Sequence, residues 1–164
     1  MQTERRKSAP LTLLVSTLLV LGLDQASKAL VRKFLPAGES VDLKLLLLRQ
    51  VRNPGTAFGL LHGRSTALFL ASIAVLAVFL FVLWWWGRAR GGLFQVALGL
   101  IIGGALGNII DRIFLGAVVD FIDLRFWPVF NLADAAIVAG VVYAIAVILA
   151  DIWKGHEVAS RERS

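Results

Sequence analysis

The chain has 164 residues, of which 58% are hydrophobic and only 17% are charged. A mean hydropathy of +0.78 and so few charges exclude an ordinary soluble domain. There are no cysteines, which excludes disulfides, thiolate metal sites and cysteine nucleophiles. The net charge of +6 comes from Lys and Arg dispersed between apolar runs, which predicts contact with membrane lipid rather than nucleic acid.

Uncharged apolar runs long enough to cross a bilayer recur four times, which predicts one membrane-embedded domain over residues 1–164. The spans are expected at about residues 11–34, 65–86, 93–115 and 131–153. The first follows a basic cluster but lacks a small-residue cleavage site, so it is interpreted as an uncleaved span. The second ends in three tryptophans followed by Arg88 and Arg90, a pattern typical of a helix leaving the bilayer.

The loop of residues 35–64, between the first two spans, is expected to form a small sheet lying on the membrane. The segment from Val41 to Leu45 alternates apolar and polar residues, as a half-buried strand does. A turn is expected at Asn53-Pro54-Gly55. In the third span, glycines recur at every fourth position (Gly99, Gly103 and Gly107), which predicts a smooth stripe for close helix packing.

Four spans place both termini on the same side of the membrane. The Lys and Arg residues divide equally between the two sides, so their number alone does not fix the orientation. Their density in the very short loop containing Arg88 and Arg90, and the basic cluster before the first span, favour cytoplasmic termini.

Several polar residues interrupt the apolar spans. Asp24 and Lys28 are four apart on one helix face, which predicts an ion pair that makes both charges tolerable near the membrane edge. Asn108 and Asp111 end the third span beside Arg112. Their spacing fits a polar helix cap and a functional site equally well.

Asp134 lies at the start of the fourth span, where Asn131 and Asp134 have the spacing of a helix capping box. A carboxylate at membrane depth costs on the order of 2.5–3.5 kcal/mol, so its retention indicates a role. Asp120 and Asp123 both lie in an apolar segment and either could partner Asp134, since spacing does not distinguish them. Two carboxylates sharing a proton would provide acid–base chemistry at a membrane surface.

Other mechanisms fit the sequence less well. Ser27 and Lys28 do not form a catalytic dyad because neighbouring helix positions point about 100° apart. His62 and His156 are too few and too separated for a metal site, and no nucleotide-binding glycine pattern occurs, so no metal or cofactor is expected. Two rival functions remain: a transporter with a proton path of aspartates, and a scaffold built on the glycine stripe. The lack of internal repeats argues against a transporter.

Five blocks in the chain resemble, in order, those of the bacterial lipoprotein signal peptidase, or signal peptidase II. They are Asp24-Gln25-Ala26-Ser27-Lys28, Asn53-Pro54-Gly55-Thr56-Ala57-Phe58, Gly103-Gly104-Ala105-Leu106-Gly107-Asn108-Ile109-Ile110-Asp111-Arg112, Val119-Asp120-Phe121 and Phe130-Asn131-Leu132-Ala133-Asp134. The resemblance covers nearly the whole chain. It departs at Thr56, where alanine is more usual.

The resemblance implies an all-α membrane protein with four transmembrane helices and a small extracytoplasmic β-sheet loop between helices one and two. It implies an aspartic endopeptidase of the bacterial inner membrane, with cytoplasmic termini and an active site at the extracytoplasmic face. Its substrates would be diacylglyceryl-modified prolipoproteins, cut just before the lipid-modified cysteine, and its inhibitors globomycin-like cyclic peptides. The implied catalytic pair is Asp120 and Asp134, which selects Asp120 over Asp123. The implied binding or supporting residues are Asp24, Lys28, Asn53, Gly104, Asn108, Asp111, Arg112, Asn131 and Ala133.

Overall fold

Three long apolar helices dominate the computed structural model, which describes residues 2–54, 81, 84–85 and 92–161. They are α1 (Gln2–Phe34), α3 (Gly92–Leu115) and α4 (Leu132–Arg161). Each contains a segment long and apolar enough to cross a membrane, at Pro10–Phe34, Gly92–Leu115 and Leu132–Trp153. These segments confirm three of the predicted spans. The remaining one, residues 65–86, lies outside the described residues except for three helical positions.

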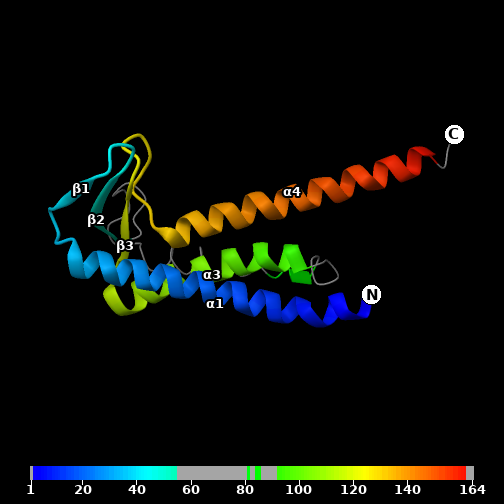
Figure 1. Ribbon diagram of the computed structural model, residues 1–164, viewed down its shortest axis with the longest axis horizontal. Helices are drawn as coiled ribbons and strands as arrows, with labels where there is room; N and C mark the ends of the chain where they lie inside the picture. Colours follow the sequence, from blue (N-terminus) through cyan, green and yellow to red (C-terminus); the bar gives the residue numbers. More distant parts are fainter. Residues whose placement is uncertain (1, 55–80, 82–83, 86–91, 162–164) are drawn as a thin grey trace.

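Helix α3 packs along both α1 and α4 (Figure 1). Glycines make this close approach possible, as the stripe predicts: a Cβ added at Gly103 would lie 2.7 Å from the backbone oxygen of Thr17 in α1. One position further, Gly104 faces the backbone oxygen of Ala133 in α4. Because the two glycines point to different neighbours, α3 is the central helix of the described bundle.

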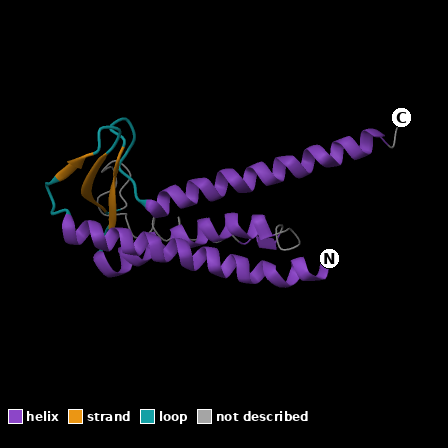
Figure 2. Ribbon diagram, in the orientation of Figure 1, coloured by secondary structure: helices purple, strands orange, loops and turns teal. Residues whose placement is uncertain are grey.

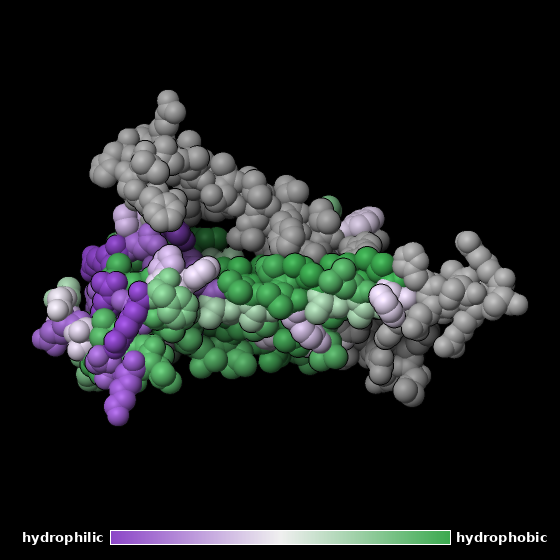
Figure 3. Space-filling model, turned by 90° about the horizontal axis from the view of Figure 1, so that it is seen from above, coloured by the Kyte–Doolittle hydropathy of each residue, from purple (hydrophilic) through white to green (hydrophobic). Residues whose placement is uncertain are grey.

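The outer faces of the bundle are apolar. In the most apolar window of each helix, 61% of α3 is buried, but only 22% of α1 and 11% of α4. A small core between α3 and α4 consists of Phe94, Ala97, Leu98, Ile101 and Ala144. Figure 3 shows apolar side chains along the helices and hydrophilic ones at the end that carries the sheet. The exposed apolar faces suit contact with lipid.

A three-stranded antiparallel sheet in the order β1-β2-β3 lies at one end of the bundle (Figure 2). Strands β1 (Ser40–Asp42) and β2 (Leu47–Asn53) come from the predicted loop. The third strand, β3 (Val118–Asp123), lies between α3 and α4, so the sheet does not come only from the loop after the first helix. The start of α1 and the end of α4 both point away from the sheet, at the opposite end of the molecule, but they lie apart from each other (Figure 1).

The strand predicted from Val41 to Leu45 is present only in part, and it is not half-buried. Strand β1 ends at Asp42 and all three of its residues are exposed. The chain then turns, with Lys44 at a φ of 69° and its backbone N–H donating to Asp42 Oδ1 at 2.7 Å. An aspartate that hydrogen-bonds two residues ahead stabilises a turn, and this local bond outweighs the short alternating pattern.

Strand β2 contains a β-bulge that sets which side chains face the site. Leu48 pairs with Ile122, but Val51 pairs with Asp120, so Arg49 and Gln50 together lie opposite one residue of β3. A shift of one residue moves every following side chain to the other face of a strand. The bulge therefore places Asn53 on the same face as Asp120.

Candidate active site

Asp134 lies in the first turn of α4, where Asn131 caps the helix. The Asn131 side-chain oxygen accepts from the Asp134 backbone N–H at 3.0 Å, and Asp134 Oδ2 accepts from the Asn131 backbone N–H at 3.2 Å. This reciprocal pair confirms the predicted capping box and holds the Asp134 carboxylate next to the Asn131 backbone.

Asp120 is brought to the same place by the loop that joins β3 to α4. Phe130 pairs with Ile122 as an isolated antiparallel bridge, so the chain returns alongside β3 just before Asn131. The side-chain NH₂ of Asn131 then donates to Asp120 Oδ1 at 2.7 Å. One asparagine therefore contacts Asp120 through its side chain and Asp134 through its backbone.

Asn108, on α3, joins this pair from the other side. Its side-chain NH₂ donates to Asp134 Oδ1 at 2.8 Å, and its side-chain oxygen accepts from Asn131 at 3.1 Å. The sequence left the role of Asn108 open between a helix cap and a site residue. The structure places it in direct contact with Asp134.

Asp120 is buried, with 2% of its surface exposed. This burial raises the pKa of its carboxyl, because a charge is poorly solvated there; the nearby Asp134 charge acts in the same direction. Hydrogen bonds from Asn53, at 3.0 Å, and from Asn131 oppose the rise, and the Lys28 charge opposes it least. Asp120 thus keeps its proton to higher pH than a solvated aspartate does.

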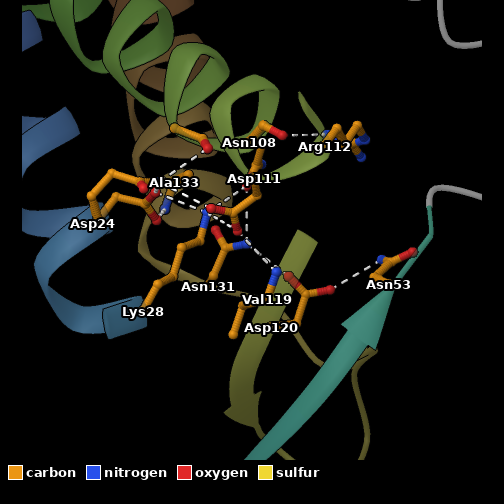
Figure 4. Close-up of polar contacts among 12 residues, drawn as sticks. Asp24, Lys28, Asn53, Asn108, Asp111, Arg112, Val119, Asp120, Asn131 and Ala133 are labelled. Atoms are coloured by element: carbon orange, nitrogen blue, oxygen red, sulfur yellow. Dashed lines mark hydrogen bonds and ion pairs between the residues drawn. The ribbon is translucent and has the colours of Figure 1, made fainter. Parts of the chain in front are cut away.

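Behind the two carboxylates, a fully buried ammonium links α1 to α3. Lys28 Nζ lies 2.8 Å from Asp24 Oδ2, 3.1 Å from Asp111 Oδ2 and 2.9 Å from Asn108 Oδ1. The predicted Asp24–Lys28 ion pair is confirmed, but it is part of a larger cluster that includes Asp111 (Figure 4). Burial this complete is tolerable because each charged group has partners.

The cluster also fixes neighbouring backbone. Asp24 Oδ1 accepts from the backbone N–H of Ala133 at the start of α4, and Asp111 Oδ2 accepts from that of Val119 in β3, both at 3.0 Å. Gly104 allows the close approach of α3 to Ala133. Through these bonds the cluster holds the two segments that carry Asp134 and Asp120.

Arg112 extends away from the buried ammonium (Figure 4). It donates to the backbone oxygen of Asn108 at 3.2 Å. Its place at the edge of the cluster, one residue after Asp111, agrees with the predicted arrangement at the end of the third span.

Gln25 also joins the cluster, although it was not among the site residues predicted from the sequence. Its side-chain NH₂ lies 3.3 Å from Asp24 Oδ2, 3.1 Å from Asp111 Oδ1 and 3.1 Å from the Gly107 backbone oxygen. The sequence did single out this position, because Gln25 belongs to the first block that carried the family resemblance. Its position in that block gave no indication of its role, since two of its partners, Gly107 and Asp111, lie 82 and 86 residues away.

Asp123 points to a different environment. It pairs with Arg49 at 2.7 Å and accepts from the backbone N–H of Arg125. That backbone bond is the main reason why its pKa is held below the usual value, with Arg49 adding to the effect. Asp123 thus has its own partners away from the asparagines that contact Asp120. Among the residues described, no group of three or more His, Asp or Glu side chains could hold a metal ion.

Apolar helices around a buried cluster of ionisable side chains define a membrane protein with a carboxylate site. A family model described as signal peptidase (SPase) II matches residues 16–150, so the chain belongs to the signal peptidase II family. It is therefore a protease, and its apolar helices agree with the bacterial inner membrane as its location.

Individual relatives agree with this assignment. The lipoprotein signal peptidase of Syntrophomonas wolfei is 47% identical over 138 residues, which cover 83% of this chain and 91% of that protein. That of Halothermothrix orenii is 40% identical over 147 residues, covering 88% and 97%. A solved structure described as a bacterial membrane enzyme has a TM-score of 0.69 at 32% identity, covering 84% of this chain and 92% of that one.

Proposed function

We propose that this protein is an aspartic endopeptidase that cuts diacylglyceryl-modified prolipoproteins just before the lipid-modified cysteine, with Asp120 and Asp134 as its catalytic pair. Removal of signal peptides from prolipoproteins is the activity that the family and the names of its relatives support. The observation that carries the aspartic mechanism is the bridging position of Asn131, which donates to both carboxylates.

The proposed chemistry uses one proton shared by the pair. Burial favours the protonated form of Asp120, and Asp134 accepts N–H groups of Asn108 and Asn131. The ionised carboxylate takes a proton from water, and this water attacks the peptide carbonyl. The protonated carboxyl stabilises the oxyanion and then gives a proton to the leaving amine. No covalent intermediate is needed.

The remaining site residues support the pair in two ways. Asp24, Lys28 and Asp111 are buried and hold the helices, so their proposed role is structural support. Asn53 and Arg112 lie at the edge of the site and are proposed to contact substrate backbone or lipid headgroup. The full fold would have four membrane helices, with cytoplasmic termini and the sheet at the outer face. Globomycin-like cyclic peptides would bind in place of substrate.

The catalytic pair is tested with Asp120→Asn and Asp134→Asn in detergent-purified protein. Each variant should lose cleavage of a lipid-modified precursor in a gel-shift assay, because an amide cannot accept or share the proton. Asp123→Asn is the matched control and should keep most activity, since Asp123 has separate partners. Near-normal turnover by either active-site variant, in folded protein, would reject the mechanism.

The lipid requirement is tested on the wild-type protein with matched precursors. Each buried methylene contributes roughly 0.8 kcal/mol, so an acyl-bearing substrate should bind far better at a site that opens to lipid. We expect the unlipidated precursor to be cut poorly or not at all. Equal rates on both precursors would instead describe a general membrane aspartic peptidase.

A further inference from the structure

Lys28 uses all three of its N–H bonds inside the protein. Two go to the carboxylates of Asp24 and Asp111, and the third goes to the side-chain oxygen of Asn108 at 2.9 Å. The side chain is fully buried, so it does not reach substrate. A lysine ammonium can only donate hydrogen bonds. Whatever faces the third N–H must therefore be an acceptor.

The Asn108 oxygen accepts from two donors, the Lys28 ammonium and the NH₂ of Asn131, and together they determine which end of the Asn108 amide faces the catalytic pair. With the oxygen directed to Lys28, the NH₂ is directed to Asp134 Oδ1, at 2.8 Å. Without the ammonium, only the Asn131 NH₂ would hold the Asn108 oxygen, and an amide that turned over would present that oxygen to the carboxylate. Two acceptors would then face each other across a buried site, which is unfavourable.

The orientation of the Asn131 amide is set by a different hydrogen bond, which does not involve Lys28. Its side-chain oxygen accepts from the Asp134 backbone N–H, which also can only donate. Its NH₂ must therefore face Asp120 and Asn108. Of the two asparagines, Asn108 is the one whose side-chain oxygen accepts from an ionisable side chain.

We propose that Lys28 is a positioning residue for catalysis, which acts by fixing the Asn108 amide so that its NH₂ is held against Asp134. The inference rests on the proposed catalytic role of Asp134. Loss of Lys28 should lower kcat by about ten- to a hundredfold, the factor of one hydrogen bond to a charged group, and leave KM nearly unchanged.

The experiment must remove the ammonium without leaving a surplus buried charge. Lys28→Met alone would leave Asp24 and Asp111 unpaired and could unfold the protein. The double variant Asp24→Asn with Lys28→Met removes one positive and one negative charge, so the net charge of the cluster is unchanged. Asp24→Asn alone gives the effect of that substitution by itself.

A double-mutant cycle separates positioning from general support. The charge-balanced variant is compared with wild type, and again in an Asn108→Ala background, by kcat and KM on a lipidated precursor. If Lys28 acts through Asn108, the loss in kcat should shrink to within about twofold when Asn108 is absent. An equal loss in both backgrounds would overturn the proposal.

A second comparison decides the matter if the Asn108→Ala background is too slow to measure. With Asp24→Asn present, Lys28→Gln keeps an N–H donor toward Asn108 and Lys28→Met does not, while the charge is the same. The glutamine variant should retain a higher kcat by about fivefold or more. Equal kcat values at equal melting temperatures would reject a positioning role.

Gln25→Met is the matched control, because Gln25 donates to the same two carboxylates but has no bond to Asn108. It should lower the melting temperature and keep kcat within about twofold of wild type. A loss of kcat as large as that of the charge-balanced variant would mean that the cluster acts only as a support. Failure of wild-type protein to cut the precursor would contradict the proposed function instead.

Discussion

Within the described part of the chain, asparagine amides rather than cations contact the two proposed catalytic carboxylates. Asn53 and Asn131 donate to Asp120, and Asn108 donates to Asp134. The Lys28 ammonium is directed to other carboxylates and is the smallest influence on the Asp120 pKa. A cation in direct contact would favour ionisation of both aspartates. Neutral donors orient the oxygens and still allow one proton to be held between them.

The substitution Asn53→Ala should move the alkaline limb of the pH–rate profile to higher pH. The Asn53 hydrogen bond lowers the Asp120 pKa by stabilising the carboxylate. Its removal raises that pKa further, so the protonated form that the mechanism uses persists to higher pH. The measurement is kcat against pH on a lipidated precursor. Arg52→Ala is the control, because Arg52 lies on the other face of β2, and it should leave the pH–rate profile unchanged. If the alkaline limb moves to lower pH in Asn53→Ala, the proposed role of protonated Asp120 is contradicted.

Among the elements, strand β2 shows how one extra residue builds part of the site. Before the bulge, Arg49 pairs with Asp123; after it, Asn53 reaches Asp120. These aspartates lie three apart in β3 and therefore point to opposite faces. Regular pairing throughout would place Arg49 and Asn53 on the same face of β2. The bulge therefore allows β2 to contact both Asp123 and Asp120.

Deletion of Arg52 should turn Asn53 away from Asp120, because it moves Asn53 to the position opposite Val119, on the other face of the sheet. The expected result is a pH–rate profile shifted as in Asn53→Ala, because the same hydrogen bond is lost. Deletion of Gln50 is the control: it removes the extra residue of the bulge but keeps Asn53 opposite Val118, so wild-type behaviour is expected. If the Arg52 deletion variant folds and its profile matches wild type, the strand register is not what positions Asn53.

The close packing of α1 against α3 at Gly103 predicts that a larger residue there lowers the stability of the protein. In Gly103→Ala the new Cβ would meet backbone of α1 at 2.7 Å, which cannot move aside easily. We expect a loss of about 1–3 kcal/mol, the usual cost of overpacking, seen as a lower melting temperature in detergent. Gly22→Ala is the control, because nothing lies within 4 Å of its Cβ position. Equal melting temperatures would show that α1 and α3 do not require this contact.

For the whole molecule, the sheet and the proposed site lie at one end, and the start of α1 and the end of α4 at the other (Figure 1). The absence of cysteine from the sequence makes single-cysteine labelling direct. In intact cells, Ser40→Cys on the exposed β1 should react with a membrane-impermeant maleimide, because the sheet is proposed to face outward. Ser160→Cys should react only after permeabilisation. The reverse pattern would invert the proposed orientation.

The sequence by itself determined the features that depend on short separations along one helix. These are the three described spans, the Asn131–Asp134 cap, the Asp24–Lys28 pair and the glycine stripe. Helix geometry is regular, so residues three or four apart share a face whatever surrounds them. The second span lies outside the described residues except for three positions, and its prediction stands untested.

Only the tertiary structure decided which residues meet across long separations. The third strand, the neighbours of Asp120 and the contacts of Gln25 could not be read from spacing, because Asn53 and Asp120 are 67 positions apart and Gln25 and Asp111 are 86 apart. The family resemblance selected Asp120 over Asp123, but it gave no physical reason. That reason is the register of β3 against β2: a strand has two faces, and its pairing partner decides which face meets the site.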